Sequence, residues 1–148
     1  MDLLRDYAII ILPLIAGFIT QAVKLATDQI KGNFTWHDIV TAYGGMPSSH
    51  SAFVISVATI VGLVDGFTNP VFGVALVLSF IVIRDAMGYR MIISDQNKIL
   101  NRLIQLLPEN EQGDFPPFQE RIGHTLPQIV VGSLIGLISA LIYYWLVF

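Results

Sequence analysis

Residues 126–148, LPQIVVGSLIGLISALIYYWLVF, form one apolar stretch without a charged side chain. A helix needs about 20 mainly apolar residues to cross the hydrocarbon core of a bilayer, and this stretch is long enough. Its last turns contain Tyr143, Tyr144 and Trp145, and such aromatic residues are typical of the membrane–water interface. We therefore predict a transmembrane helix over 126–148 and a fold built inside a membrane.

Three further apolar segments precede this helix, over residues 7–25, 51–64 and 71–83. The first is long enough to cross a membrane, whereas the second and third are short for a span. Each of these two must therefore include polar neighbours, namely Pro47–His50 for the second and Arg84–Arg90 for the third. Polar groups at that depth have to face protein or a water-filled cavity, and they commonly mark a functional site.

Residues 91–107 follow a different pattern, which is typical of an amphipathic helix. We expect either an interfacial helix or a continuation of the third helix beyond the membrane. Pro108 ends the pattern. The apolar side contains Ile92, Ile99, Leu103, Ile104 and Leu107, and the polar side contains Asp95, Lys98, Asn101 and Arg102.

The composition supports this interpretation. The 148 residues are 54% hydrophobic and 13% charged, with a mean hydropathy of +0.68, whereas a soluble domain carries about 25% charged residues. The predicted fold class is thus all-α: a polytopic bundle of about four membrane helices plus an amphipathic helix, in a single domain over 1–148. The absence of cysteine excludes thiolate sites, and the net charge of −3 argues against nucleic acid as a partner. A second copy of so small a bundle could help to enclose a polar site.

Positive charge is concentrated on one side of the predicted topology. If all four segments cross the membrane, every lysine and arginine except Arg5 lies on the same side, and the positive-inside rule makes that side cytoplasmic. We therefore expect an integral membrane protein whose functional face is cytoplasmic. The residues on this side are Lys24, Lys31, Arg84, Arg90, Lys98, Arg102 and Arg121.

Motifs that suit phosphate chemistry fall on the same side. The start of a helix at Pro47-Ser48-Ser49-His50 would offer free N–H groups to an anion, and the nearby cations would neutralise a phosphoryl group. His50 and His124 could then act as nucleophile and general acid. The other candidates are Lys24-x6-Lys31, Arg121 three residues before His124, and the cluster Arg84, Asp85 and Arg90.

Simpler interpretations remain open for these residues. Ser48 and Ser49 could have no role beyond capping the helix. Asp85 could have no role beyond an ion pair with Arg84 or Arg90. A metal site built from His50, His124 and Asp85 lacks the close ligand spacing of known sites, so we expect no metal and no other cofactor. His37 belongs to no motif.

The stretch Gly44–Ala52, GGMPSSHSA, resembles the signature of the divergent type-2 phosphatidic acid phosphatase family, whose members are related to acid phosphatases and vanadium-dependent haloperoxidases. The similarity continues through Asp85–Arg90, Gln96, Ile99–Asn101 and Gly123–Thr125, and covers roughly residues 24–132. It implies that His124 attacks phosphorus to give a phosphohistidine and that His50 protonates the leaving alcohol. It also implies that Lys24, Lys31 and Ser48 hold the phosphoryl oxygens.

The chain departs from the wider pattern of this superfamily at several positions. Ser49 stands in place of a glycine, and Arg121 is closer to His124 than the expected arginine. Gln128 stands where a carboxylate would orient the nucleophile and stabilise its cation, so Asp85 or Glu120 would have to substitute for it.

The sequence therefore predicts a metal-independent phosphoric monoester hydrolase of the membrane. Its substrate would be a lipid phosphate such as phosphatidylglycerol phosphate, phosphatidic acid, or a polyprenyl phosphate or diphosphate. Gln128 favours an alternative, in which the protein binds a lipid phosphate without hydrolysing it.

Overall fold

The computed structural model describes residues 2–27, 45–113 and 115–148, and within these ranges the chain is helical without a strand. This confirms the predicted all-α fold, and the four apolar segments correspond to α2, α4, α5 and α8. The short helices α1 and α7 were not predicted. The helices are α1 (Asp2–Asp6), α2 (Ala8–Thr27), α4 (Ser49–Val64), α5 (Pro70–Met87), α6 (Tyr89–Ile104), α7 (Glu109–Gln112) and α8 (Leu126–Val147).

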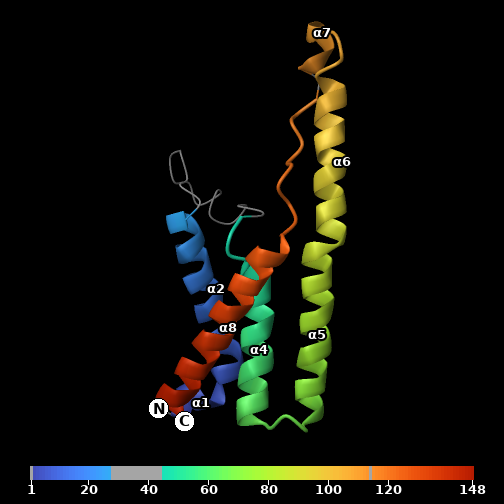
Figure 1. Cartoon of the computed structure of the whole chain (residues 1–148). Coiled ribbons are helices and arrows are strands. Elements are labelled where there is room, and N and C mark those ends of the chain that lie inside the picture. Colours follow the sequence, from blue (N-terminus) through green and yellow to red (C-terminus); the bar gives the residue numbers. More distant parts are fainter. Residues whose placement is uncertain (1, 28–44, 114) are drawn as a thin grey trace.

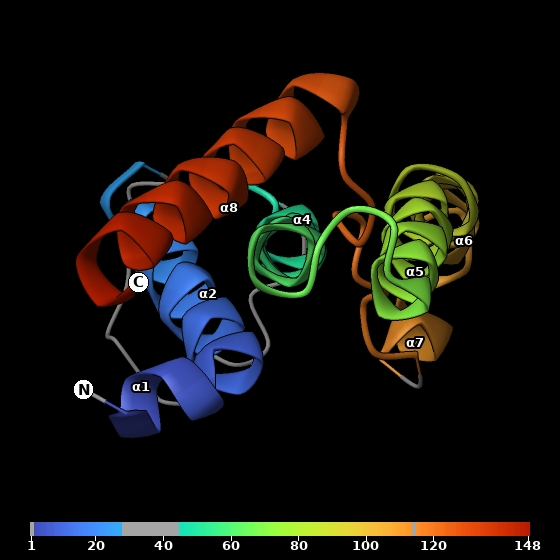
Figure 2. The same cartoon turned by 90° about the horizontal axis from the view of Figure 1, so that it is seen from below.

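The four apolar helices alternate in direction, and α4 lies at the centre of the bundle. It packs against α2, α5 and α8, and Figure 2 shows it between the pair α2 and α8 on one side and α5 on the other. As a result, the last turns of α2 and α5 and the first turns of α4 and α8 lie at the same end of the four-helix bundle, the end from which α6 continues (Figure 1). The segments that carry the predicted motifs therefore converge on one end.

Local sequence signals explain where these helices begin. The Ser48 hydroxyl caps α4 by accepting from the Ser51 N–H, and the Asn69 side chain caps α5 ahead of a proline in the first turn. Thr125 and Gln128 form a capping box at the start of α8, in which each side chain accepts from the backbone of the other residue. The cap interpretation of Ser48 is thus correct as far as local structure is concerned.

The outer surface of the bundle is apolar, and small residues are among those buried between its helices. Val74, Phe80 and Trp145 are 69%, 66% and 82% exposed, whereas Ala52 and Ala140 are completely buried. Membrane helices typically pack in this way, with small residues between helices and large apolar residues toward lipid. By length and hydropathy, the helices over Pro70–Ile104 and Leu126–Val147 can cross a membrane, and α2 and α4 are shorter apolar helices.

The amphipathic segment continues the third apolar helix beyond the bundle. Helix α6 follows α5 in nearly the same direction (Figure 1), with only Gly88 between them. The two together span 35 residues, or about 52 Å at 1.5 Å per residue, which exceeds the roughly 30 Å of hydrocarbon in a bilayer. Of the two arrangements that the sequence left open, the structure therefore shows the continuation.

The end of the bundle opposite the motifs is closed by contacts between the two termini. The Tyr143 hydroxyl donates to the Leu4 carbonyl at 2.8 Å, and Arg5 Nε donates to the Val147 carbonyl at 2.7 Å. The Arg5 guanidinium also lies 5.5 Å from the centre of the Phe148 ring. The predicted topology places Arg5, alone among the lysines and arginines, on this side of the membrane. These contacts give Arg5 a structural role.

Candidate active site

The first turns of α4 and α8 are bonded directly to each other. The Ser48 N–H donates to the Gln128 carbonyl at 3.1 Å, and the Ser51 hydroxyl donates to the Ile129 carbonyl at 3.1 Å. Gly132 allows this approach, because a Cβ at that position would collide with the Ser48 carbonyl and the Ser51 hydroxyl. The two helix starts, which carry the predicted motifs, are therefore held in fixed register.

This register brings the two predicted catalytic histidines together. The ring centroids of His50 and His124 are 5.9 Å apart and the ring planes are tilted by 57°. His50, the second residue of α4, is exposed, whereas only 4% of His124 is exposed. Among the described residues, none forms a hydrogen bond with His124 Nδ1, which is buried. One ring of the pair is thus exposed and the other is buried.

Burial lowers the pKa of the His124 imidazole below its usual value, and the charges of His50 and Lys24 act in the same direction. The Gln128 side chain and the Gly45 backbone have the opposite effect on this pKa. Because a lowered pKa keeps the ring neutral at lower pH, His124 has an unprotonated nitrogen available at neutral pH. This is the form that a nucleophile requires.

Three predicted cations approach the histidines from other helices. Lys24, in the last turn of α2, is only 6% exposed. Arg90 Nε forms an ion pair with Asp85 Oδ2 at 2.8 Å, with both side chains partly exposed, so the predicted ion pair of Asp85 is present. Arg84 is exposed on α5, and it lines the same pocket as His50.

Two cavities meet at His50. The first, which we call the charged pocket, has a volume of about 580 Å³, and the second, the apolar groove, has a volume of about 420 Å³ and runs between α2, α4 and α5. His50 and Val82 line both cavities. The charged pocket is also lined by Phe80, Ile81, Arg84, Asp85, Tyr89 and Arg90, and the apolar groove by Gly17, Ser49, Phe53, Val54 and Leu78.

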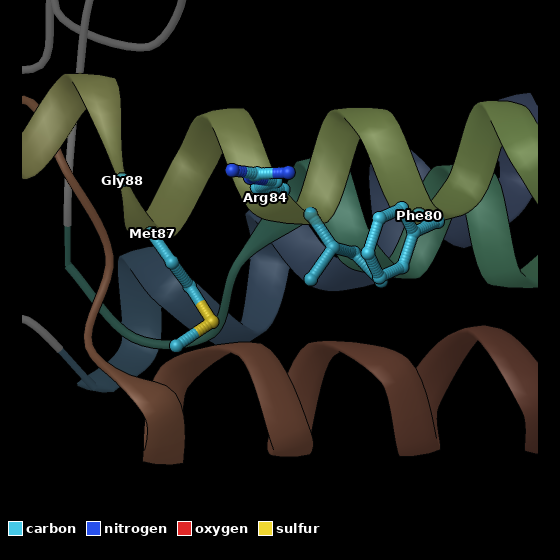
Figure 3. A pocket seen from close by; sticks show the side chains of 5 residues that line it. Phe80, Arg84, Met87 and Gly88 are labelled. Atoms are coloured by element: carbon cyan, nitrogen blue, oxygen red, sulfur yellow. The ribbon is translucent and has the colours of Figure 1, made fainter.

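A third, smaller cavity extends along α5 beside the charged pocket. It has a volume of about 320 Å³ and is lined by Phe80, Ile83, Arg84, Met87 and Gly88. Figure 3 shows the Met87 side chain pointing from α5 toward the ribbon of α8, with Arg84 one turn earlier on the same helix. Arg84 and Phe80 also line the charged pocket, so they form the boundary between a charged and a nearly apolar surface.

Other predicted phosphate ligands lie away from the charged pocket. Arg121 lines a separate cavity of about 340 Å³, together with Lys98, Glu120 and Gln128. Ser49 lines the apolar groove, and its hydroxyl donates to the Gln21 side chain at 3.4 Å. Lys31 and His37 lie outside the described residues. The structure therefore groups His50, Arg84, Asp85 and Arg90, with Lys24 and His124 close by, and separates Arg121 and Ser49 from them.

The carboxylates that could substitute for the missing acid bind other partners. Asp85 is paired with Arg90, and Glu120 accepts a hydrogen bond from Asn101 at 2.8 Å. The Gln128 side chain accepts from the Thr125 N–H at 2.9 Å as part of the α8 cap. In the described parts of the chain, no group of three or more histidine and acidic side chains is placed to hold a metal.

Sequence reasoning missed several residues near the site. Tyr89 and Phe80 line the charged pocket, and Gln21 holds Ser49. Gln21 had a visible signal, because it forms a polar pair with Thr20 inside an apolar segment. Tyr89 had none, because an aromatic residue at the end of an apolar helix is usual at a membrane boundary.

Comparison with known proteins gives a consistent result. A sequence model described as the divergent PAP2 family matches residues 6–139 of the chain. The chain is also 30% identical, over 153 aligned positions that cover 96% of each protein, to a protein of Bacillus subtilis (strain 168) described as the uncharacterized membrane protein YuiD. No solved structure matches. The chain is therefore a membrane protein that belongs to the divergent PAP2 family.

Proposed function

We propose that this protein is a phosphatase of membrane lipid phosphates that works through a phosphohistidine. The observation that carries the proposal is a pair of imidazoles: His50 lines both the charged pocket and the apolar groove, and the centroid of the His124 ring lies 5.9 Å from that of His50. A phosphate ester of a lipid has the same two parts, an anionic headgroup and a hydrocarbon chain. Membership in a PAP2-related family supports the same class of reaction.

The proposed reaction has two steps. In the first, a neutral ring nitrogen of His124 attacks phosphorus, the P–O bond to the lipid alcohol breaks, and protonated His50 gives its proton to the departing oxygen. In the second, water attacks the phosphohistidine, His50 takes a proton from that water, and the P–N bond breaks to release inorganic phosphate. Lys24 and Arg90 would stabilise the negative charge on the equatorial oxygens.

The apolar groove supports a lipid rather than a soluble phosphate ester as the substrate. It lies between helices whose outer surfaces are apolar, and its lining extends from His50 to residues nearer the middle of α2 and α5, such as Gly17 and Leu78. The concentration of basic residues at this end of the bundle favours the cytoplasmic face. We therefore expect an intermediate made on that face, such as phosphatidylglycerol phosphate, phosphatidic acid, or a polyprenyl phosphate or diphosphate.

One observation favours a second function, the binding of a lipid phosphate without hydrolysis. The side chain of Gln128, at the position where the superfamily has an acid, caps α8, and Nδ1 of His124 has no carboxylate partner among the described residues. Without a carboxylate the imidazolium that forms during attack is less stabilised. This would slow the reaction while leaving the anion site intact.

Phosphate release by the purified protein separates these two functions. We expect the wild-type protein in detergent, with chelator present, to release inorganic phosphate from at least one of the lipid phosphates named above. We also expect vanadate to inhibit, because it mimics pentacoordinate phosphorus. Saturable binding of a lipid phosphate with no release from any member of the panel would contradict the phosphatase and support the binding protein.

Filling the apolar groove should discriminate between substrates by chain length. Leu78→Trp places a larger ring in the groove, so we expect KM for a long-chain lipid phosphate to rise about tenfold, whereas a short-chain water-soluble analogue keeps its KM. Val74→Trp is the matched control, because Val74 is 69% exposed one turn away and lines neither cavity. Equal effects of Leu78→Trp on the two substrates would show that the chain does not occupy the groove.

A further inference from the structure

An extended segment over residues 118–124 lies along α6 and leads directly into the candidate active site. Figure 1 shows this return segment descending beside α6 before α8 begins. Asn101 binds its first residue twice, since Asn101 Nδ2 donates to the Phe118 carbonyl at 2.7 Å and Asn101 Oδ1 accepts from the Phe118 N–H at 2.8 Å. Asn97 Nδ2 donates to the Gln119 carbonyl at 2.6 Å. Two asparagines of α6 thus act as backbone partners for a segment that has no secondary structure of its own.

Ser94 binds the same segment closer to the histidines. Its hydroxyl accepts from the N–H groups of Ile122 at 3.0 Å and Gly123 at 3.1 Å, and donates to the Arg90 carbonyl at 2.9 Å. The side chain is buried, with 3% exposed. Gly123 lies so close to α6 that a Cβ there would be 2.7 Å from the Met91 nitrogen. The segment is therefore in direct backbone contact with the helix at this point.

The last bond of the series involves the proposed nucleophile itself. The His124 N–H donates to the Ala86 carbonyl at 3.0 Å. Ala86 lies in the last turn of α5, where carbonyls have no partner within the helix, and the junction at Gly88 leaves this one available. The segment that ends at His124 is thus hydrogen-bonded to Asn97, Asn101 and Ser94 of α6 and to Ala86 of α5.

We propose that Ser94, Asn97 and Asn101 are positioning residues, and that α6 sets the location of the His124 ring relative to His50. Positions 94, 97 and 101 are spaced by three and four residues and so lie on one face of α6. None of the three lines the charged pocket or the apolar groove. Without these bonds, the connection from α7 to α8 would gain many conformations, and a displaced nucleophile loses rate steeply with distance.

The consequence for catalysis rests on the proposed function and can be measured as a kinetic split. We expect Asn101→Ala to lower kcat by on the order of tenfold, because the nucleophile is displaced in a larger fraction of molecules. KM should stay within about twofold, because the residues that would bind headgroup and chain lie on α2, α4, α5 and the start of α6. Asn97→Ala removes one bond instead of three and should give a smaller change in the same direction. Gln96→Ala, an exposed residue on another face of α6, is the matched control and should have no effect.

A second measurement does not depend on turnover. In protein labelled with ¹⁵N-histidine, the side-chain signals of His124, identified by their loss in His124→Asn, should shift and broaden in Asn101→Ala but not in Gln96→Ala. If the wild-type protein proves inactive, the phosphatase proposal fails while this measurement still tests the positioning role. Unchanged kcat together with unchanged His124 signals in Asn101→Ala would overturn the role of α6. If Asn101→Ala does not fold, the same two readouts on Asn97→Ala decide.

Discussion

Replacing His124 with alanine should lower the rate of phosphate release from a lipid phosphate by on the order of 10³-fold or more. The imidazole is the buried member of the pair with His50, and the proposed mechanism assigns the attack on phosphorus to it. Its pKa is lowered by burial, which keeps it unprotonated and ready to attack at neutral pH. The bond from its backbone N–H to Ala86 does not need the side chain, so we expect the helices to remain folded.

The measurement is inorganic phosphate released by purified variants in detergent micelles, with circular dichroism to confirm equal helix content. His37→Ala is the matched control, because His37 is the one histidine of the sequence besides His50 and His124 and belongs to no motif. It should keep the wild-type rate. If His124→Ala retained more than about a tenth of that rate, attack by His124 would be wrong, because loss of a nucleophile costs far more. Another group would then have to form the bond to phosphorus.

Replacing Gly132 with leucine should have the largest effect on stability, because its Cβ would collide with backbone rather than with a movable side chain. The atoms it would meet are the Ser48 carbonyl and the Ser51 hydroxyl, at the N-cap and in the first turn of α4. To admit the side chain, α8 has to move away from α4 and break the bonds of Ser48 and Ser51 to it. Overpacking of this kind costs about 1–3 kcal/mol and sometimes more, and we expect about 3 kcal/mol here.

Thermal unfolding in detergent measures this effect, and Gly73→Leu provides the comparison. Gly73 lies in α5 with open space around its missing Cβ, and leucine is the better helix former, so Gly73→Leu should be neutral or mildly stabilising. Phosphate release should fall in Gly132→Leu and persist in Gly73→Leu, because only the former separates His50 from His124. Equal unfolding temperatures in the two variants would show that α4 and α8 do not depend on this contact.

The membrane helices could be predicted because their signal is local. The apolar stretch 126–148 became α8 (Leu126–Val147) almost without change, and the stretch after Asn69-Pro70 became α5. The motif-bearing helix ends also converge as predicted, because an up-and-down bundle leaves few other arrangements. The helical periodicity of residues 91–107 predicts an amphipathic helix, but it does not determine how that helix is oriented relative to the preceding one. Only the structure shows that α6 continues α5.

Contacts between distant segments could not be predicted from local patterns. Arg121 was expected near the phosphate because it precedes His124 by three residues. The extended chain that connects them is bonded to α6, however, and Arg121 lines another cavity. Ser94 and Asn101 lie among charged residues that suggest a solvent-facing side of a helix. Their hydrogen-bond partners include backbone groups 17 to 29 residues later, and backbone groups leave no trace in a sequence pattern.

Helix α4 is short for a membrane-spanning helix, and its length bears on how the proposed lipid substrate would reach His50. Its 16 residues extend about 24 Å, several ångströms less than the roughly 30 Å hydrocarbon layer. Local thinning of the bilayer relieves such a hydrophobic mismatch. Thinning lowers the polar boundary toward the start of α4, so the proposed substrate would meet His50 while its chains stay in the leaflet. The barrier of the proposed reaction would then not include the energy of extracting a lipid from the membrane.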